Sequence, residues 1–149
     1  MQTNSDFEDI LLAFNDAGVK YLVVGAYAVA AHSRPRATGD IDLWVEASAE
    51  NARCVFRALA AFGAPMEKVD EQTFSDLDIV FQIGLPPIRI DVLTSIDGVS
   101  FDRAWPNRVA STIGRVTTQV IGRLDLLQNK KMSGRAKDLA DIERLTRDA

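Results

Sequence analysis

The segment VVGAYAVAAHSRPRATGDIDLWVE, Val23–Glu46, carries the strongest structural signal in the chain. It predicts a buried strand ending at Gly25, a short alanine-rich helix, a loop with one proline and two arginines, and a second strand, DIDLWVE. Residues two apart on a strand point to the same face, so the side chains of Asp40 and Asp42 project together. A glycine between a strand and a helix leaves backbone N–H groups free, and such a turn is typical of an anion site.

Two ionised carboxylates so close together repel each other, and a bound cation relieves this repulsion. Carboxylate oxygens suit Mg²⁺, which binds one or two carboxylates together with substrate phosphates. An edge strand with a solvated polar face is the alternative reading of the same residues. The position of Gly25 before the acidic pair, and of Arg34 and Arg36 in the intervening loop, favours a polyphosphate and metal site.

A third carboxylate, Asp91, lies in the apolar strand pattern IRIDVLT, where an acid needs a partner. If this strand lies beside DIDLWVE, the three carboxylates can hold two Mg²⁺ ions about 3.5–4 Å apart, as in phosphoryl and nucleotidyl transfer. A second acidic pair, Asp76 and Asp78, has the same spacing as the first. It lacks the preceding glycine turn, and we interpret it as the solvated start of a strand.

The remaining pattern alternates helices and strands. Amphipathic helices are expected over Asn4–Ala17 and Ser48–Phe62, and a glycine follows each of them. The runs LDIVFQI and IRIDVLTSI read as strands joined by a GLPP turn, and two shorter strands flank Gly114. Helical spacing resumes at Arg123, with a break at Ser133–Gly134.

These elements predict one domain over residues 1–149, of the α/β (α+β) class, with a small mixed sheet flanked by helices. Its core spans about residues 20–121 and its C-terminal helical part about residues 122–147.

The composition indicates an ordinary soluble protein, with 47% hydrophobic and 26% charged residues. A net charge of −4 argues against non-specific coating of DNA. The only cysteine, Cys54, has no partner for an internal disulfide, which suits a reducing cytoplasm. The N-terminal sequence lacks a signal-peptide pattern, and no apolar stretch reaches the roughly 20 residues that span a membrane. We therefore expect a cytoplasmic protein.

The glycine turn, the helix after it, DIDLWV and the later RID together resemble the DNA polymerase β-type nucleotidyltransferase superfamily. The C-terminal sequence LLQNKKMSGRAKDLADIERL is similar to its AbiEii-like group, which includes toxins of toxin–antitoxin systems. The resemblance covers about Tyr21–Leu145. It implies a nucleotidyltransferase core, an NTP substrate and two Mg²⁺ ions, with Mn²⁺ as an alternative.

The resemblance also implies roles for individual residues. Asp40 and Asp42 match the paired metal ligands, and Asp91 matches the third catalytic acid. The positions that match nucleotide-binding residues are Gly25 and Ala26 in the turn, a phosphate-binding lysine at Lys130, and a basic-acidic pair at Lys137 and Asp138. Ala26 departs from the serine that many members have, so this position offers only its backbone N–H.

The C-terminal helices allow a second reading from the residues alone, as a charged helix surface with i, i+4 pairing between Lys137 and Asp141.

The leading functional expectation is transfer of a nucleoside monophosphate from an NTP to an acceptor hydroxyl. The triphosphate would lie between the Gly25 turn, Arg36 and Lys130, and the acceptor would be tRNA or a protein. A cognate antitoxin or toxin would be the protein partner. Two other classes fit the same residues: a non-catalytic, antitoxin-like binding module with this fold, and an antibiotic-modifying nucleotidyltransferase. The sequence itself does not select the acceptor.

Overall fold

The computed structural model describes residues 5–34, 38–85 and 87–147. It contains one six-stranded sheet with the strand order β3-β4-β2-β1-β6-β5. Strand pairs β2–β4 and β1–β6 are parallel, and the other neighbouring pairs are antiparallel, so the sheet is mixed. The strands are β1 (Tyr21–Val24), β2 (Asp40–Val45), β3 (Val80–Leu85), β4 (Ile88–Leu93), β5 (Val109–Ile113) and β6 (Val116–Val120).

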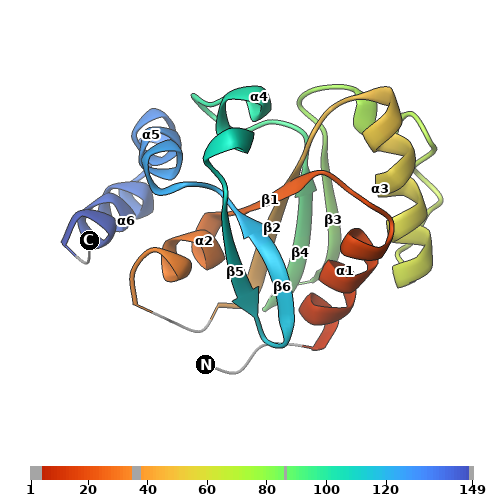
Figure 1. Cartoon of the computed structure of the whole chain (residues 1–149), viewed down its shortest axis with the longest axis horizontal. Helices are drawn as coiled ribbons and strands as arrows, with labels where there is room; N and C mark the ends of the chain where they lie inside the picture. Colours follow the sequence, from red (N-terminus) through yellow and green to blue (C-terminus); the bar gives the residue numbers. More distant parts are fainter. Residues whose placement is uncertain (1–4, 35–37, 86, 148–149) are drawn as a thin grey trace.

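Helices cover the sheet from two sides. Figure 1 shows α1 and α3 together on one side, and α2, α5 and α6 on the other. No helix in the described ranges has the length and apolarity needed to cross a membrane. The helices are α1 (Ser5–Asp16), α2 (Gly25–Ala31), α3 (Ala49–Phe62), α4 (Phe101–Ala104), α5 (Arg123–Ser133) and α6 (Ala136–Arg147), with 3₁₀ turns η1 (Thr73–Ser75) and η2 (Trp105–Asn107).

This architecture confirms the predicted α/β class with its small mixed sheet and flanking helices. The helix ends follow the sequence signals. Ser48 caps α3, because its Oγ accepts a hydrogen bond of 3.2 Å from the Asn51 N–H. Gly63 ends the same helix in the left-handed region at φ 95°, and Gly134 separates α5 from α6 at φ 64°.

The core lies between the centre of the sheet and the helices. The strand β1 is buried along its whole length, and α1 buries one stripe at helical spacing, namely Phe7, Ile10, Leu11 and Phe14. Burying each such side chain contributes roughly 1.5–3 kcal/mol. Trp44 is also buried and packs edge-on against Phe101. The central strands are therefore packed tightly against the core, which fixes the positions of the acids that β2 and β4 carry.

The strand register brings the predicted acids together. In the parallel pair β2–β4, Asp42 is the partner of Asp91, and Asp40 is the partner of Arg89. In the antiparallel pair β1–β2, Val24 lies opposite Asp42, so the Gly25 turn follows directly beside this carboxylate. The condition set by the sequence, that the IRID strand lies beside the DID strand, is met.

The C-terminal helices dock beside the loop after α2. The Arg144 guanidinium on α6 donates hydrogen bonds to Ser33 Oγ at 3.2 Å and to the Arg34 carbonyl at 2.7 Å. These bonds join the end of the chain to the segment that leads into β2. Helices α5 and α6 are thereby placed opposite Asp40 and Asp42 on β2 and Asp91 on β4.

Candidate active site

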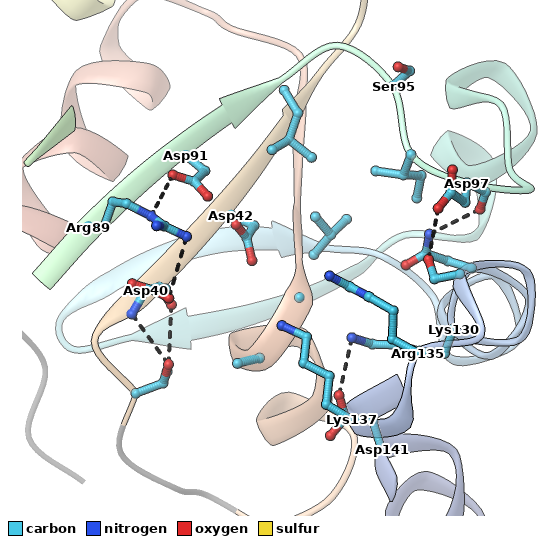
Figure 2. Close-up of a pocket in the computed structure, with 18 of the residues that line it drawn as sticks. Asp40, Asp42, Arg89, Asp91, Ser95, Asp97, Lys130, Arg135, Lys137 and Asp141 are labelled. Atoms are coloured by element: carbon cyan, nitrogen blue, oxygen red, sulfur yellow. Dashed lines mark hydrogen bonds and ion pairs between the residues drawn. The ribbon is translucent and has the colours of Figure 1, made fainter. Parts of the chain in front are cut away.

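A cleft of about 620 Å³ lies between the strands β2 and β4 and the helices α5 and α6. Figure 2 shows the carboxylates on the strands facing the charged side chains on the helices. The charged residues in its lining are Asp40, Asp42, Arg89, Asp91, Asp97, Lys130, Arg135, Lys137 and Asp141. The backbone turn at Gly25 and Ala26 also lines the cleft, as the sequence suggested.

Two features of the structure explain why residue 25 is a glycine. Gly25 has φ +69°, and a Cβ built there would lie 2.0 Å from Asp42 Oδ2. The glycine therefore allows the turn to approach the carboxylate itself, in a backbone conformation that costs other residues energy. The sequence predicts that the backbone here approaches a phosphate, and the structure shows that the Asp42 carboxylate also lies against this turn.

The three predicted acids lie on β2 and β4, where they line the cleft, and Arg89 lies among them. Arg89 Nη2 is 3.8 Å from Asp40 Oδ2, and Arg89 Nε is 3.1 Å from Asp91 Oδ1. Asp91 is only 7% exposed. The contact between Arg89 and Asp91 lacks hydrogen-bond geometry, so Asp91 Oδ1 and Arg89 Nε are buried without a hydrogen-bond partner. Arg89 is a site residue that the sequence motifs did not reveal, although its spacing places it on the same strand face as Asp91.

The carboxylates repel one another. Burial, followed by the charges of Asp91 and Asp40, raises the pKa of Asp42 to about 6, and the nearby Lys137 acts in the opposite direction. Hard oxygen donors with this excess of negative charge suit Mg²⁺ or Mn²⁺. Among the described residues, no three acidic, histidine or cysteine side chains are already placed to hold a metal ion. Arg89 lies in contact with Asp40 and Asp91 instead.

The raised pKa of Asp42 predicts a pH-dependent stability. The folded protein binds this proton more tightly than the unfolded chain, whose pKa lies near 3.8. The contribution of Asp42 to stability is therefore most favourable below pH 4, and it declines as the pH rises through about 6. Without metal, Asp42→Asn should raise the melting temperature more at pH 7.5 than at pH 4.5. Melting curves of both proteins in EDTA test this, and an equal difference at both pH values would contradict the raised pKa.

Lys130 is held in a buried ion-pair network. Its residue is 5% exposed, and its Nζ lies 3.2 Å from both Asp138 Oδ1 and Asp141 Oδ2. Asp138 is fully buried, and its Oδ2 also accepts a 2.7 Å hydrogen bond from Arg135 Nε. The sequence resemblance implies that Lys130 binds phosphate. In the structure its ammonium group is already paired with Asp138 and Asp141, so Lys130 also has a structural role. The alternative pairing of Lys137 with Asp141 is replaced by the pairing of Lys130 with Asp141.

Within the described part of the chain, Lys137, unlike Lys130, faces the acids and is not held in an ion-pair network. It is exposed, and among the described residues its side chain forms no ion pair or hydrogen bond, although its charge acts on Asp42. Figure 2 shows Lys137, at the start of α6, and Arg135, just before this helix, pointing into the cleft towards Asp42. Arg135 lines the cleft as well, and no sequence motif pointed to it. The last predicted nucleotide-binding residue, Arg36, lies outside the described residues.

The second acidic pair lies outside this cleft, as expected. Asp76 and Asp78 are exposed and absent from its lining. Asp78 Oδ1 accepts a 2.7 Å hydrogen bond from Ser95 Oγ. Asp78 also has φ 63°, in the left-handed region, so it forms a turn before β3.

The chain matches no protein-family model and no curated protein sequence. Its fold, however, resembles solved structures of nucleotidyltransferases. The lincosamide antibiotic adenylyltransferase LnuA, solved with lincomycin, aligns with a TM-score of 0.64 and 16% identity over 99% of this chain and 98% of that chain. The antibiotic-resistance factor ANT(2'')-Ia aligns with a TM-score of 0.66 and 14% identity, over 96% and 82%.

A third structure, a provisionally assigned nucleotidyltransferase from Thermotoga maritima, aligns with a TM-score of 0.61 and 14% identity, over 96% and 91%. Together these likenesses show that the chain has a nucleotidyltransferase fold. The narrower resemblance to the AbiEii-like group stays a prediction from the sequence.

Proposed function

We propose that the protein is a metal-dependent nucleotidyltransferase that moves a nucleoside monophosphate from an NTP to an acceptor hydroxyl. The observation that carries this proposal is the pairing of Asp42 with Asp91 in register, beside Asp40 and across the cleft from Lys137. Three carboxylates on one side, with the Lys137 ammonium and the Arg135 guanidinium on the other, suit a metal-bound polyphosphate. The nucleotidyltransferase fold supports the same reaction class.

The side chains divide into two roles. Lys137 and the exposed part of Arg135 would bind phosphate oxygens and orient the triphosphate. Asp40, Asp42 and Asp91 would hold Mg²⁺ once Arg89 has moved. Bound Mg²⁺ would neutralise phosphate charge and align the attacking and leaving oxygens.

In the proposed chemical step, one bond to phosphorus forms and one breaks. The acceptor oxygen forms a bond to the α-phosphorus, the bond from this phosphorus to the bridging oxygen breaks, and pyrophosphate leaves with its electron pair. Asp91 Oδ1, which is buried without a hydrogen bond, would accept the proton of the acceptor hydroxyl and pass it to water. Positioning and charge stabilisation then supply most of the catalysis.

The proposal names two candidate classes of acceptor. The sequence resemblance favours tRNA or a protein as the acceptor, with a toxin–antitoxin partner. The fold of LnuA matches this chain over nearly the full length of both, and that enzyme acts on a lincosamide antibiotic. We therefore carry a small hydroxyl-bearing antibiotic as a second candidate acceptor. The non-catalytic binding module requires that the three acids have no chemical role, and their joint placement in the cleft favours catalysis.

Incubation with each labelled NTP and Mg²⁺ tests the proposal. Parallel reactions contain tRNA, a cytoplasmic protein extract, or a panel of lincosamide and aminoglycoside antibiotics. Label transferred to one acceptor class, with release of pyrophosphate, is the expected result. Failure of every NTP to bind and to release pyrophosphate would assign the protein to the non-catalytic class.

Lys137→Ala should weaken NTP binding about 10- to 100-fold, because one charge-assisted contact to phosphate contributes roughly 1.5–3 kcal/mol. The melting temperature should fall only slightly at neutral pH, since Lys137 has no ion pair within the described residues and acts on Asp42 through its charge alone. Calorimetric titration with a non-hydrolysable NTP and Mg²⁺ measures the effect. The matched control is Lys131→Ala, an exposed lysine outside the cleft lining. Equal affinities of Lys137→Ala and the parent would remove Lys137 from the site.

A further inference from the structure

Arg89 is placed by the sheet at the centre of the acidic cluster. It is the register partner of Asp40 in the parallel pair, and it precedes Asp91 by two residues on the same strand face. Its guanidinium lies 3.8 Å from one carboxylate and 3.1 Å from the other. A positive charge therefore lies beside the two acids that would bind a metal ion.

The manner in which Arg89 is held differs from that of a structural arginine in the same protein. Arg135 binds Asp138 through hydrogen bonds from Nε at 2.7 Å, from Nη2 at 3.3 Å and from its backbone N–H at 3.2 Å. Arg89 has charge contacts with Asp40 and Asp91, but its Nε forms no hydrogen bond. Its side chain is 29% exposed and borders the cleft.

Bidentate, hydrogen-bonded guanidinium–carboxylate pairs are the strong and geometrically fixed ones. A guanidinium that neutralises two carboxylates without such bonds contributes mainly its charge. A small divalent ion contributes twice that charge and binds carboxylate oxygens directly. The contacts of Arg89 therefore favour its replacement by a metal ion, and its exposed edge gives it room to move into the cleft.

We propose that Arg89 is the resident cation of the metal-free carboxylate cluster and that a divalent metal ion binds by displacing it from Asp40 and Asp91. This inference rests on the proposed function, since it takes the cluster to be a metal site. Arg89 is then a positioning residue that keeps the three acids together before metal arrives. It also lowers metal affinity in the absence of a nucleotide.

Manganese binding without nucleotide tests this competition. Free Mn²⁺ is measured by electron paramagnetic resonance during titration of the parent, Arg89→Gln and Arg53→Gln. Arg89→Gln removes the competing charge and should bind Mn²⁺ about tenfold more tightly. Arg53→Gln makes the same charge change on the exposed face of α3, outside the cleft lining, and should match the parent. Unchanged or weaker Mn²⁺ binding by folded Arg89→Gln would overturn the proposal.

Two further measurements keep the test decisive. Arg89→Lys retains the charge and should bind Mn²⁺ within about twofold of the parent, because charge governs the competition; tightening equal to that of Arg89→Gln would overturn the proposal. If Arg89→Gln does not fold, the nuclear magnetic resonance signal of Arg89 Nε–H in the parent decides, assigned by its loss in Arg89→Lys. Saturating Mg²⁺ should shift this signal, and an unmoved signal would refute displacement.

The outcomes separate this inference from the proposed function. A parent protein that binds NTP with Mn²⁺, but whose Mn²⁺ affinity is unaffected by Arg89→Gln, refutes the role of Arg89 alone. A parent that binds Mn²⁺ more tightly after Arg89→Gln, yet binds no NTP, refutes the proposed function and leaves the competition intact.

Discussion

Asp42→Asn should reduce nucleotidyl transfer to background while the variant melts at a higher temperature than the parent at neutral pH. The lost charge removes a proposed metal ligand, which lies between Gly25 and Asp91. The same change relieves the burial and repulsion that raise the pKa of Asp42 to about 6. The stability gain at neutral pH should be on the order of 1–2 kcal/mol. Pyrophosphate release and thermal melting, measured on the same preparations, give both values.

The matched control for this prediction is Asp78→Asn. It makes the same chemical change in the other Asp-x-Asp pair, outside the cleft lining. Transfer by Asp78→Asn should equal that of the parent. Full activity in Asp42→Asn, or loss of activity in Asp78→Asn, would mean that the wrong acidic pair has been identified.

Lys130→Ala should destabilise the protein by about 1.5–3 kcal/mol, the usual contribution of a charge-assisted hydrogen bond, because Arg135 still neutralises Asp138 in this variant. The change leaves Asp138, which is fully buried, without its ammonium partner, and it also removes the contact to Asp141. Urea denaturation measures the loss. The buried ion pairs thus give Lys130 a structural role in addition to the phosphate-binding role that the sequence resemblance implies.

The neighbouring Lys131 supplies the control, because it is exposed and lies on the same helix. Lys131→Ala should change stability by less than about 0.5 kcal/mol. A parent-like urea midpoint for Lys130→Ala, combined with weaker NTP binding, would return Lys130 to the phosphate-binding role that the sequence resemblance implied.

Much of the fold was predictable because its signals are local. Period-two and helical spacing located the strands and helices, and glycines at positions such as Gly63 and Gly134 ended the helices. The acids were recognisable for the same reason, since Asp40 and Asp42 share one strand face whatever the strand pairs with. The register that places Asp91 beside Asp42 depends on packing between distant segments, and the sequence supplied it only as a condition.

The charged partners were the part that local reasoning could not supply. The partners of Lys130 lie on the next helix, beyond the Gly134 break, and its pairing with Asp138 depends on how α5 and α6 pack. Arg89 contacts Asp40 only because the two strands are parallel and in register. A basic residue read from sequence is equally compatible with a phosphate ligand and a structural counterion, and only its neighbours separate the two.

Titration of the purified protein with a non-hydrolysable NTP, in Mg²⁺ and then in EDTA, tests the central claim most directly. If the cleft binds a metal-bridged triphosphate through Asp40, Asp42 and Asp91, the nucleotide binds in Mg²⁺. Binding is then lost in EDTA, and Asp42→Asn abolishes it in Mg²⁺ as well. Absence of binding by the parent in Mg²⁺, or equal affinity in Mg²⁺ and EDTA, would contradict the account.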